Sequence, residues 1–352
     1  MLHKRALSSE STTKNQDQKP SPLRPRRYLE LLLLMGLGCA VAAAQCNVYV
    51  ANRETNSVSV FNSLTNQLVA MVPVGNQPLR VAITPNGAFA YVVNTTHLGL
   101  ITSNSVSVIN TATNAVVTTI PVGGYPAGLA ITPNGASAYV ANLGSNDVSV
   151  INTGTNTVTT TVAVGTGPWR VGITPNGAFA YVSNSGSNNV SVIDTATNTV
   201  VAAVPVGASP AGVAITPNGA FAYVTNYLGN NVSVIDTATN TVVATVAVGN
   251  DPVDIAITPS GTFAYVANDS TENVSVIDTS TNKVVSIVPV GLTPRGVAIT
   301  PDGAFAYVTN EADSTVSVIN TATNAVVDTV RGVTLLPEGL AIMRQPGAVT
   351  CR

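Results

Sequence analysis

The tetrapeptide Tyr-Val-x-Asn recurs along most of the chain and constrains its fold more than any other feature. Successive copies are 42 residues apart, with a single interval of 48. A period of this length suits one four-stranded sheet per repeat, which is typical of solenoids and propellers. The seven copies begin at Tyr49, Tyr91, Tyr139, Tyr181, Tyr223, Tyr265 and Tyr307.

Each repeat predicts four short strands, which we name a, b, c and d in chain order. In residues 294–335, two apolar runs flank the turn Pro301-Asp-Gly303, and two more flank the turn from Asn320 to Asn324. The runs are rich in Val and Ile and are separated by turn residues. Both faces of the runs carry apolar or small residues, as expected where each sheet packs between two neighbours. The sequence therefore predicts an all-β protein.

The two ends of the repeat region predict a closed ring. The first repeat begins directly at strand b, residues 47–52, without a preceding strand a. The missing strand is found near the C-terminus, where residues 337–343 match strand a of the other repeats. A last strand that completes the first sheet removes free sheet edges. We therefore predict a seven-bladed β-propeller of four-stranded antiparallel blades, closed by this C-terminal strand.

The repeat resembles that of the YVTN family of seven-bladed β-propeller proteins. The resemblance is carried by Tyr-Val-Thr-Asn at residues 223–226 and 307–310 and by near copies elsewhere, and it spans residues 46–343. It implies an exported or cell-surface propeller. It implies no catalytic residue, because a fold alone does not determine a function.

Residues 1–44 are predicted to be an export signal, ahead of a propeller domain at residues 45–352. Seven Lys or Arg and three acidic residues are followed by an apolar stretch of 14 residues, Leu31 to Ala44, which is short for a membrane span. The small residues at 42–44 match a cleavage site. We expect cleavage, with no membrane insertion afterwards, and a periplasmic, cell-surface or secreted protein; retention of the segment as an anchor is the alternative.

Two cysteines remain after the signal, Cys46 and Cys351, at opposite ends of the propeller sequence. Because these ends meet in the first blade of a closed ring, we predict a disulfide between them in an oxidising compartment. Closing a loop of about 300 residues would stabilise the fold by roughly 5 kcal/mol in the chain-entropy model. The alternative is two unpaired thiols.

Charge and histidine content argue against several functions. The chain has 15 Lys and Arg and 17 Asp and Glu, of which the signal holds seven and three, so eight basic and fourteen acidic residues remain. Lys283 is the one lysine beyond the signal, which argues against a nucleic-acid partner. His97 is the one histidine beyond the signal, and no Cys or His pair there has ligand spacing. We predict no metal site and no cofactor.

Differences between the repeats indicate where a site should lie. The a–b and c–d turns hardly vary, whereas the b–c and d–a loops at the other end of the strands differ from repeat to repeat. Repeat scaffolds often bind through one loop-rich face, and aromatic and Arg residues dominate recognition. The alternative is that these loops vary freely, with a lone Trp filling the axis. The candidate ligand-binding residues on this face are Arg80, Tyr125, Trp169, Arg170, Tyr227, Asp254, Arg295, Glu338 and His97.

Two patterns concern the channel mouth itself. Arg80, Arg170 and Arg295 come from three blades, so an anion shared by all three would have to lie near the axis. Glycines at matched positions of strand a indicate either close backbone packing or room for a ligand. These glycines are Gly128, Gly212, Gly296 and Gly339.

The favoured function is a non-catalytic binding or cell-envelope protein. We predict a monomer that recognises a protein, glycan or small ligand outside the cytoplasm through the loop-rich face. The alternative is a propeller enzyme, either lyase-like or the scaffold subunit of a dehydrogenase, that uses the channel mouth. No nucleophile, base and orienting acid can be assembled from motifs, and His97 is the one ordinary base at neutral pH. A purely structural role, with many copies covering a cell surface, is a third possibility.

Overall fold

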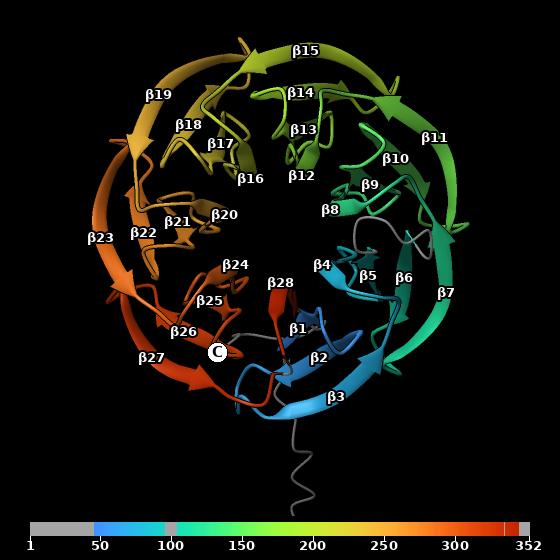
Figure 1. Cartoon of the computed structure of the whole chain (residues 1–352), viewed down its shortest axis with the longest axis vertical. Coiled ribbons are helices and arrows are strands. Elements are labelled where there is room, and N and C mark those ends of the chain that lie inside the picture. The colour runs from blue at the N-terminus through green and yellow to red at the C-terminus, as the bar shows by residue number, and fades with distance from the viewer. Residues whose placement is uncertain (1–45, 96–103, 334, 345–352) are drawn as a thin grey trace, which may run out of the picture. The chain divides into compact units, whose positions relative to one another are not determined.

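Seven four-stranded antiparallel sheets surround a central axis in the computed structural model (Figure 1). The structure describes residues 46–95, 104–333 and 335–344, all within the compact unit Val41–Arg352. Blade 1 is the sheet β28-β1-β2-β3, and blades 2 to 7 follow in chain order from β4–β7 to β24–β27. The predicted all-β, seven-bladed propeller is confirmed. The predicted export signal, His97 and Cys351 lie outside the described residues.

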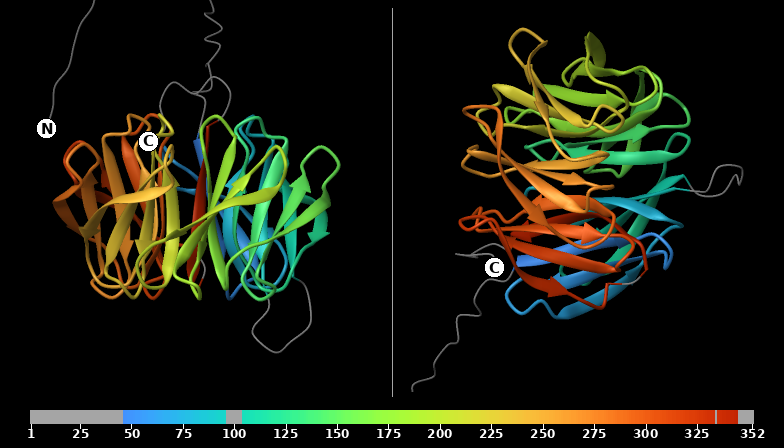
Figure 2. Two further views of the ribbon diagram at one scale, coloured as in Figure 1. Left: turned by 90° about the horizontal axis from the view of Figure 1, so that it is seen from above. Right: turned by 60° about the vertical axis from the view of Figure 1, so that its left-hand side comes forward.

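Strands a, b, c and d of each repeat lie in that order from the axis outward (Figures 1 and 2). The innermost strands are β28 (Pro337–Arg344), β4 (Pro78–Ile83), β8 (Pro126–Ile131), β12 (Pro168–Ile173), β16 (Pro210–Ile215), β20 (Pro252–Ile257) and β24 (Pro294–Ile299). The b strands are β1 (Cys46–Asn52), β5 (Phe89–Asn94), β9 (Ser137–Asn142), β13 (Phe179–Asn184), β17 (Phe221–Asn226), β21 (Phe263–Asn268) and β25 (Phe305–Asn310). The c strands are β2 (Ser57–Asn62), β6 (Ser105–Asn110), β10 (Asp147–Asn152), β14 (Asn189–Asp194), β18 (Asn231–Asp236), β22 (Asn273–Asp278) and β26 (Thr315–Asn320). The outermost strands are β3 (Leu68–Pro73), β7 (Ala115–Pro121), β11 (Thr157–Ala163), β15 (Thr199–Pro205), β19 (Thr241–Ala247), β23 (Lys283–Pro289) and β27 (Ala325–Val330).

The ring closes within blade 1, as the sequence predicts. Strand β28 pairs antiparallel with β1, with Tyr49 opposite Ala341 and Val48 opposite Ile342. Cys46, at the start of β1, is fully buried and disulfide-bonded. Its predicted partner lies outside the described residues, so the Cys46–Cys351 pairing stays a prediction.

The hydrophobic core lies between the blades rather than inside a single sheet. In one cluster, Tyr91 and Val93 of blade 2 pack with Leu129, Val140 and Ile151 of blade 3. The b and c strands are buried on both faces, while most residues of the d strands are exposed. This packing explains why the inner strands are apolar on both faces. Among the described residues, no helix is long and apolar enough to cross a membrane.

The tyrosine of the repeated tetrapeptide bonds each blade to the next. Tyr223 of blade 5 donates a hydrogen bond to Asn282 Oδ1 in the c–d turn of blade 6, at 2.6 Å. Burial raises the pKa of Tyr223 to about 12, so its hydroxyl remains a donor at physiological pH. The equivalent bond from Tyr307 to Asn66 joins blade 7 to blade 1 at 3.5 Å. The Tyr therefore recurs because every blade junction uses it.

The asparagine of the tetrapeptide holds the opposite end of each blade. In blade 5, Asn226 Nδ2 donates to Ser233 Oγ on the neighbouring c strand at 2.9 Å. A Cβ on Gly207 would lie 2.6 Å from the Asn226 side chain, so the preceding d–a loop packs directly on this amide. The repeated Asn therefore fixes the base of the variable loops.

A candidate binding site at the channel mouth

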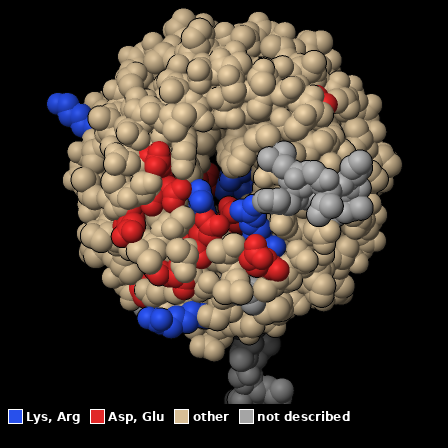
Figure 3. Space-filling view, in the orientation of Figure 1, with Lys and Arg blue, Asp and Glu red and all other residues tan. Residues whose placement is uncertain are grey.

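A cavity of about 350 Å³ opens at the end of the ring that carries the b–c and d–a loops. Figure 3 views the ring along its axis and shows acidic side chains gathered on one side of a central hollow, beside several basic ones. Six of the nine predicted ligand-binding residues line the cavity: Tyr125, Trp169, Arg170, Tyr227, Arg295 and Glu338. The structure therefore brings most of the predicted residues together around one cavity, and their role in ligand binding stays a prediction.

The d–a loops present variable side chains from a fixed backbone. The residue before the proline of strand a has a positive φ in each described loop, for example 49° at Tyr125 and 52° at Ser209. Non-glycine residues adopt this conformation uncommonly, so the surrounding structure must impose it. At Ser209, this conformation is held by a 2.8 Å hydrogen bond from the Ser209 amide to Asn188 Oδ1 in the preceding b–c loop.

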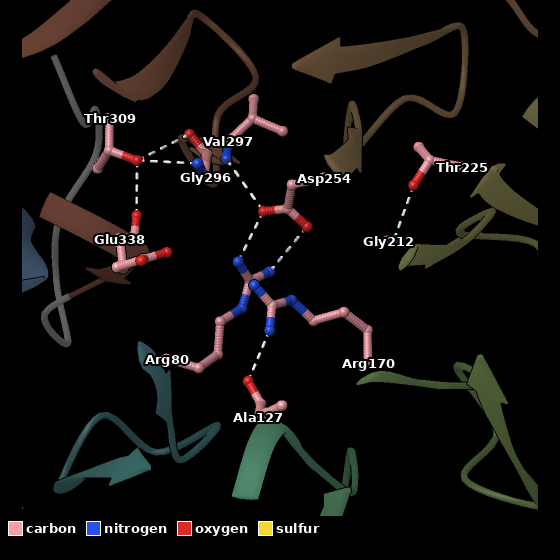
Figure 4. A network of polar contacts seen from close by, with 10 residues as sticks. All are labelled: Arg80, Ala127, Arg170, Gly212, Thr225, Asp254, Gly296, Val297, Thr309 and Glu338. Atoms are coloured by element: carbon pink, nitrogen blue, oxygen red, sulfur yellow. Dashed lines mark hydrogen bonds and ion pairs between the residues drawn. The ribbon is translucent and has the colours of Figure 1, made fainter. Parts of the chain in front are cut away.

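An ion pair spans the axis at the mouth. Arg80 of β4 donates to both carboxylate oxygens of Asp254 on β20, at 2.6 and 3.2 Å (Figure 4). Asp254 also accepts the amide of Val297 on β24 at 3.1 Å, and its side chain is only 2% exposed. This network joins blades 2, 6 and 7. Arg80 and Asp254, both predicted as ligand contacts, are thus occupied by one another and are not among the residues that line the cavity.

Arg170 of β12 lies beside Arg80 in the same network (Figure 4). It is 7% exposed, and its guanidinium is 5.4 Å from the centre of the Trp169 ring. Its Nη1 donates to the carbonyl oxygen of Ala127 at 2.6 Å, while Nε has no hydrogen-bond partner in the described part of the chain. Burial, and then repulsion from Arg80, lowers the pKa of Arg170 to about 10. The side chain therefore stays charged at neutral pH, at an energetic cost.

The acidic side of the mouth holds a second arginine. Arg295 of β24 donates from Nε to Glu311, and its Nη1 lies 2.9 Å from Asp269 Oδ2. Burial raises the pKa of Asp269 against the opposing effect of Arg295, and Glu311 raises it further. Two neighbouring carboxylates therefore share one guanidinium.

Glu338 of β28 completes the acidic side. Its carboxylate lies 3.4 Å from Arg53 Nη1, and its pKa is raised chiefly by burial and next by Glu311. Tyr125, Trp169 and Tyr227, which come from blades 3 to 5 and their loops, form the aromatic side of the same cavity. The mouth therefore has an acidic half and an aromatic half, with Arg170 between them.

The matched glycines of strand a serve close packing. A Cβ on Gly128 would lie 2.4 Å from the carbonyl oxygen of Trp169, and one on Gly296 would lie 2.7 Å from that of Glu338. Both distances are below van der Waals contact, so the innermost strands could not approach as they do with any larger residue. Of the two interpretations drawn from the sequence, the structure supports backbone packing. That packing positions Trp169, Arg170 and Glu338.

The hypothesis of one anion shared by three arginines is not supported, because Arg80 and Arg295 are each paired with carboxylates. Sequence reasoning also missed Arg53 as a lining residue, although its position in a variable b–c loop was a usable signal. It missed that Asp269 and Glu311 neutralise Arg295, which depends on loop conformation. No group of three His, Cys, Asp or Glu among the described residues could hold a metal ion.

The chain matches the model of the family "Lactonase, 7-bladed beta-propeller" over residues 130–286, less than half of its length. Among solved structures it is similar to Kuenenia stuttgartiensis hydrazine synthase, with 29% identity and a TM-score of 0.71 over 78% of this chain and 92% of that one. A proposed 6-phosphogluconolactonase from Bacteroides fragilis is 19% identical, with a TM-score of 0.72 over 86% and 99% of the two chains. A likeness at 19% identity shows the fold alone. None of the curated proteins matches the chain. The resemblance to YVTN proteins stays a prediction.

Proposed function

We propose that this protein is an exported, non-catalytic binding propeller whose mouth cavity takes up a small ligand. The observation that carries the proposal is the convergence of the variable side chains on one cavity, while the turns at the other end of the ring repeat almost unchanged. A volume of about 350 Å³ and a lining of aromatic and apolar residues with a few charged groups are typical of small-molecule sites. A concave site of this kind favours a small ligand over a protein partner or a purely structural role.

The exported location is part of the proposal. It is supported by the basic and then apolar segment at residues 1–44 and by the disulfide at Cys46. Disulfides persist in the periplasm and outside the cell and are rare in the cytosol. Fractionation of cells that express the full chain tests this location, and recovery of the protein in the cytosol with a free Cys46 thiol would contradict it.

A thermal-shift screen tests ligand binding. The protein, produced from the full chain, is screened against sugars, organic acids and aromatic metabolites, because a ligand at 100 times its Kd stabilises a protein by about 2.7 kcal/mol. We expect at least one compound to raise the melting temperature of the wild-type protein, and Trp169→Ala to abolish that shift. The matched control is Val243→Ala, an exposed residue of β19 on the outer rim, which should keep the shift. Absence of any shift across the screen would contradict a small-molecule site.

Lactone hydrolysis is a second candidate, favoured by the family match over residues 130–286, which include Trp169, Arg170 and Tyr227. In this reaction a water oxygen bonds to the lactone carbonyl carbon and the water gives up a proton, the ring C–O bond breaks, and the released alkoxide takes up that proton. Glu338, a buried carboxyl group at the cavity with a raised pKa, is placed to move that proton, and Arg170 is placed to stabilise the oxyanion.

A pH-stat assay with gluconolactone tests this alternative. An enzyme would accelerate hydrolysis well beyond the spontaneous rate, and Glu338→Gln would lower the rate by about 100-fold or more. Hydrolysis at the spontaneous rate by the wild-type protein would leave non-catalytic binding as the function of the site.

A further inference from the structure

Arg170 differs from the other arginines of the mouth in lacking an acidic partner. Arg53 is paired with Glu338, Arg80 with Asp254, and Arg295 with Asp269 and Glu311. No ion pair involves Arg170 among the described residues. Within the part of the chain that the structure describes, the mouth therefore holds one guanidinium without a carboxylate in ion-pair contact.

The surroundings of Arg170 make this charge costly. The side chain is more than nine-tenths buried, lines the cavity, and has one nitrogen, Nε, without a hydrogen-bond partner in the described residues. Arg80 repels it most and Arg295 least, while Asp254 and Glu338 attract it without forming an ion pair with it. A buried charge without a close counter-ion destabilises a protein, and such an arrangement persists when something outside the chain supplies the missing group.

We infer that the mouth cavity binds a ring-bearing monocarboxylate, with the carboxylate on Arg170 and the ring against the aromatic half of the mouth. This inference rests on the proposed binding function and specifies its ligand. A guanidinium recognises a carboxylate through charge-assisted N–H···O bonds, and Arg170 lines the cavity without a carboxylate of the described residues on it. The ligand's charge would then complete an ion pair in a largely water-excluded site.

The acidic half of the mouth limits the charge of the ligand. Glu338 lines the same cavity, and Asp269 and Glu311 surround Arg295 beside it. A phosphate or sulfate dianion would meet the same single unpaired guanidinium but stronger repulsion from these carboxylates. One negative charge matches the one guanidinium that lacks a carboxylate, whereas the second charge of a dianion would have no partner and would lie near Glu338.

The aromatic half of the mouth specifies a ring. Tyr125, Trp169 and Tyr227 line the cavity together with the apolar side chains of Leu79, Ala211 and Val253. Aromatic and sugar rings stack on such side chains, and burial of their apolar surface adds affinity. A short-chain acid such as acetate would reach Arg170 but leave this wall uncovered, and should bind weakly.

Calorimetric titration of the wild-type protein tests the inference. The probes are 4-hydroxybenzoate, cinnamate and glucuronate, each compared with its neutral amide, and phenyl phosphate serves as the dianion. We expect at least one carboxylate to bind at least ten-fold more tightly than its amide and more tightly than phenyl phosphate. Equal or tighter binding of the amides or of phenyl phosphate would overturn the inference while leaving small-ligand binding intact. Failure of every probe would overturn the inference as well, and the wider thermal-shift screen then decides separately on the proposed function.

Two variants locate the interaction. Arg170→Met should lower the affinity for the best carboxylate at least ten-fold and leave the affinity for its amide nearly unchanged. Arg331→Met, at an exposed position after the outer strand β27, should alter neither affinity. Unchanged carboxylate binding by Arg170→Met would overturn the assignment. If that variant fails to fold, Arg170→Lys, which keeps the charge but loses the paired hydrogen bonds, replaces it and should weaken carboxylate binding selectively.

Discussion

The two ends of the propeller place carboxyl groups in opposite environments. At the end that carries the repeated turns, the amide of Thr197 and then that of Ala196 lower the pKa of Asp194 by donating hydrogen bonds to its carboxylate. At the mouth, burial raises the pKa of Glu338 and that of Asp269. The charge of Asp194 at the turn end has its donors nearby, whereas the mouth retains charges that the fold does not fully satisfy.

This difference separates the residues that build the ring from those available for binding. The same strands carry the hydrogen bonds of the repeated Tyr at the turn end, and the repeated Asn and the charged and aromatic mouth at the other end. Unsatisfied or strained groups that persist in a stable scaffold are frequent at functional sites. If the proposed function is correct, the repeated turns mainly build the ring, and the irregular end combines structural contacts with recognition.

The largest effect on the free energy of unfolding is expected at the Arg80–Asp254 ion pair, which joins blades across the mouth. Asp254→Ala would leave Arg80 without its acceptor and remove the bond to the Val297 amide, which should lower the free energy of unfolding by about 3–5 kcal/mol. Denaturant-induced unfolding measures this loss. The double variant Arg80→Leu with Asp254→Leu removes both charges and should lose less than Asp254→Ala alone. A loss below about 1 kcal/mol in Asp254→Ala would show that the pair does not brace the mouth.

Arg170→Met, unlike Asp254→Ala, should not destabilise the protein. Because this variant removes a buried charge that has no close carboxylate, the ligand-free protein should be as stable as wild type or up to about 2 kcal/mol more stable. The measurement is the same unfolding experiment without ligand. A loss similar to that of Asp254→Ala would mean that Arg170 holds the mouth together and would weaken the distinction between the two arginines.

Two tyrosines of blade 5 compare the two ends directly. Tyr223→Phe removes the hydrogen bond to Asn282 in the turn of the next blade and should cost about 1 kcal/mol of unfolding free energy. Tyr227→Phe removes a mouth hydroxyl that bonds to Asp269, a partly exposed contact, and should cost less than about 0.5 kcal/mol. Equal costs would argue that stability is not concentrated at the turn end.

The smallest effect is a difference in pH dependence. A carboxyl group whose pKa is raised by folding destabilises the protein as pH rises above its ordinary value, which is 4.5 for Glu338. One whose pKa is lowered by folding, such as Asp194, stabilises the protein above 3.8 and loses that contribution as pH falls below it. The free energy of unfolding, measured from pH 3 to 7, should therefore decline less steeply above pH 4.5 in Glu338→Gln than in wild type. Below pH 3.8 it should fall less steeply in Asp194→Asn than in wild type. The contrast between the two ends would be contradicted if Glu338→Gln instead reduced the loss at acid pH and Asp194→Asn reduced the decline above pH 4.5.

Much of the fold could be predicted because the same pattern of strands and turns recurs several times along the chain. The spacing of the tetrapeptide indicated the blades, and the displaced strand at residues 337–343 indicated how the ring closes. The face and most of the cavity lining followed from which positions vary. Trp169 and Glu338, for example, occupy matched positions at the start of strand a.

The pairing of charges at the mouth could not be predicted in the same way. Arg80 and Asp254 are 174 residues apart, and their contact depends on the diameter of the ring and on which blades face one another across it. That Arg170 has no carboxylate in contact becomes apparent only when the acidic partners of the other arginines have been located in the structure. A repeat pattern gives the position of each residue within its blade but not its partner across the axis.

A crystal structure of the protein soaked with the best carboxylate from the titration would test the central claim most directly. We predict carboxylate oxygens within about 3 Å of the Arg170 guanidinium, with the ring against Trp169 and its aromatic neighbours. An empty mouth with the ligand bound elsewhere, or a ligand whose carboxylate points away from Arg170, would contradict this account of the site.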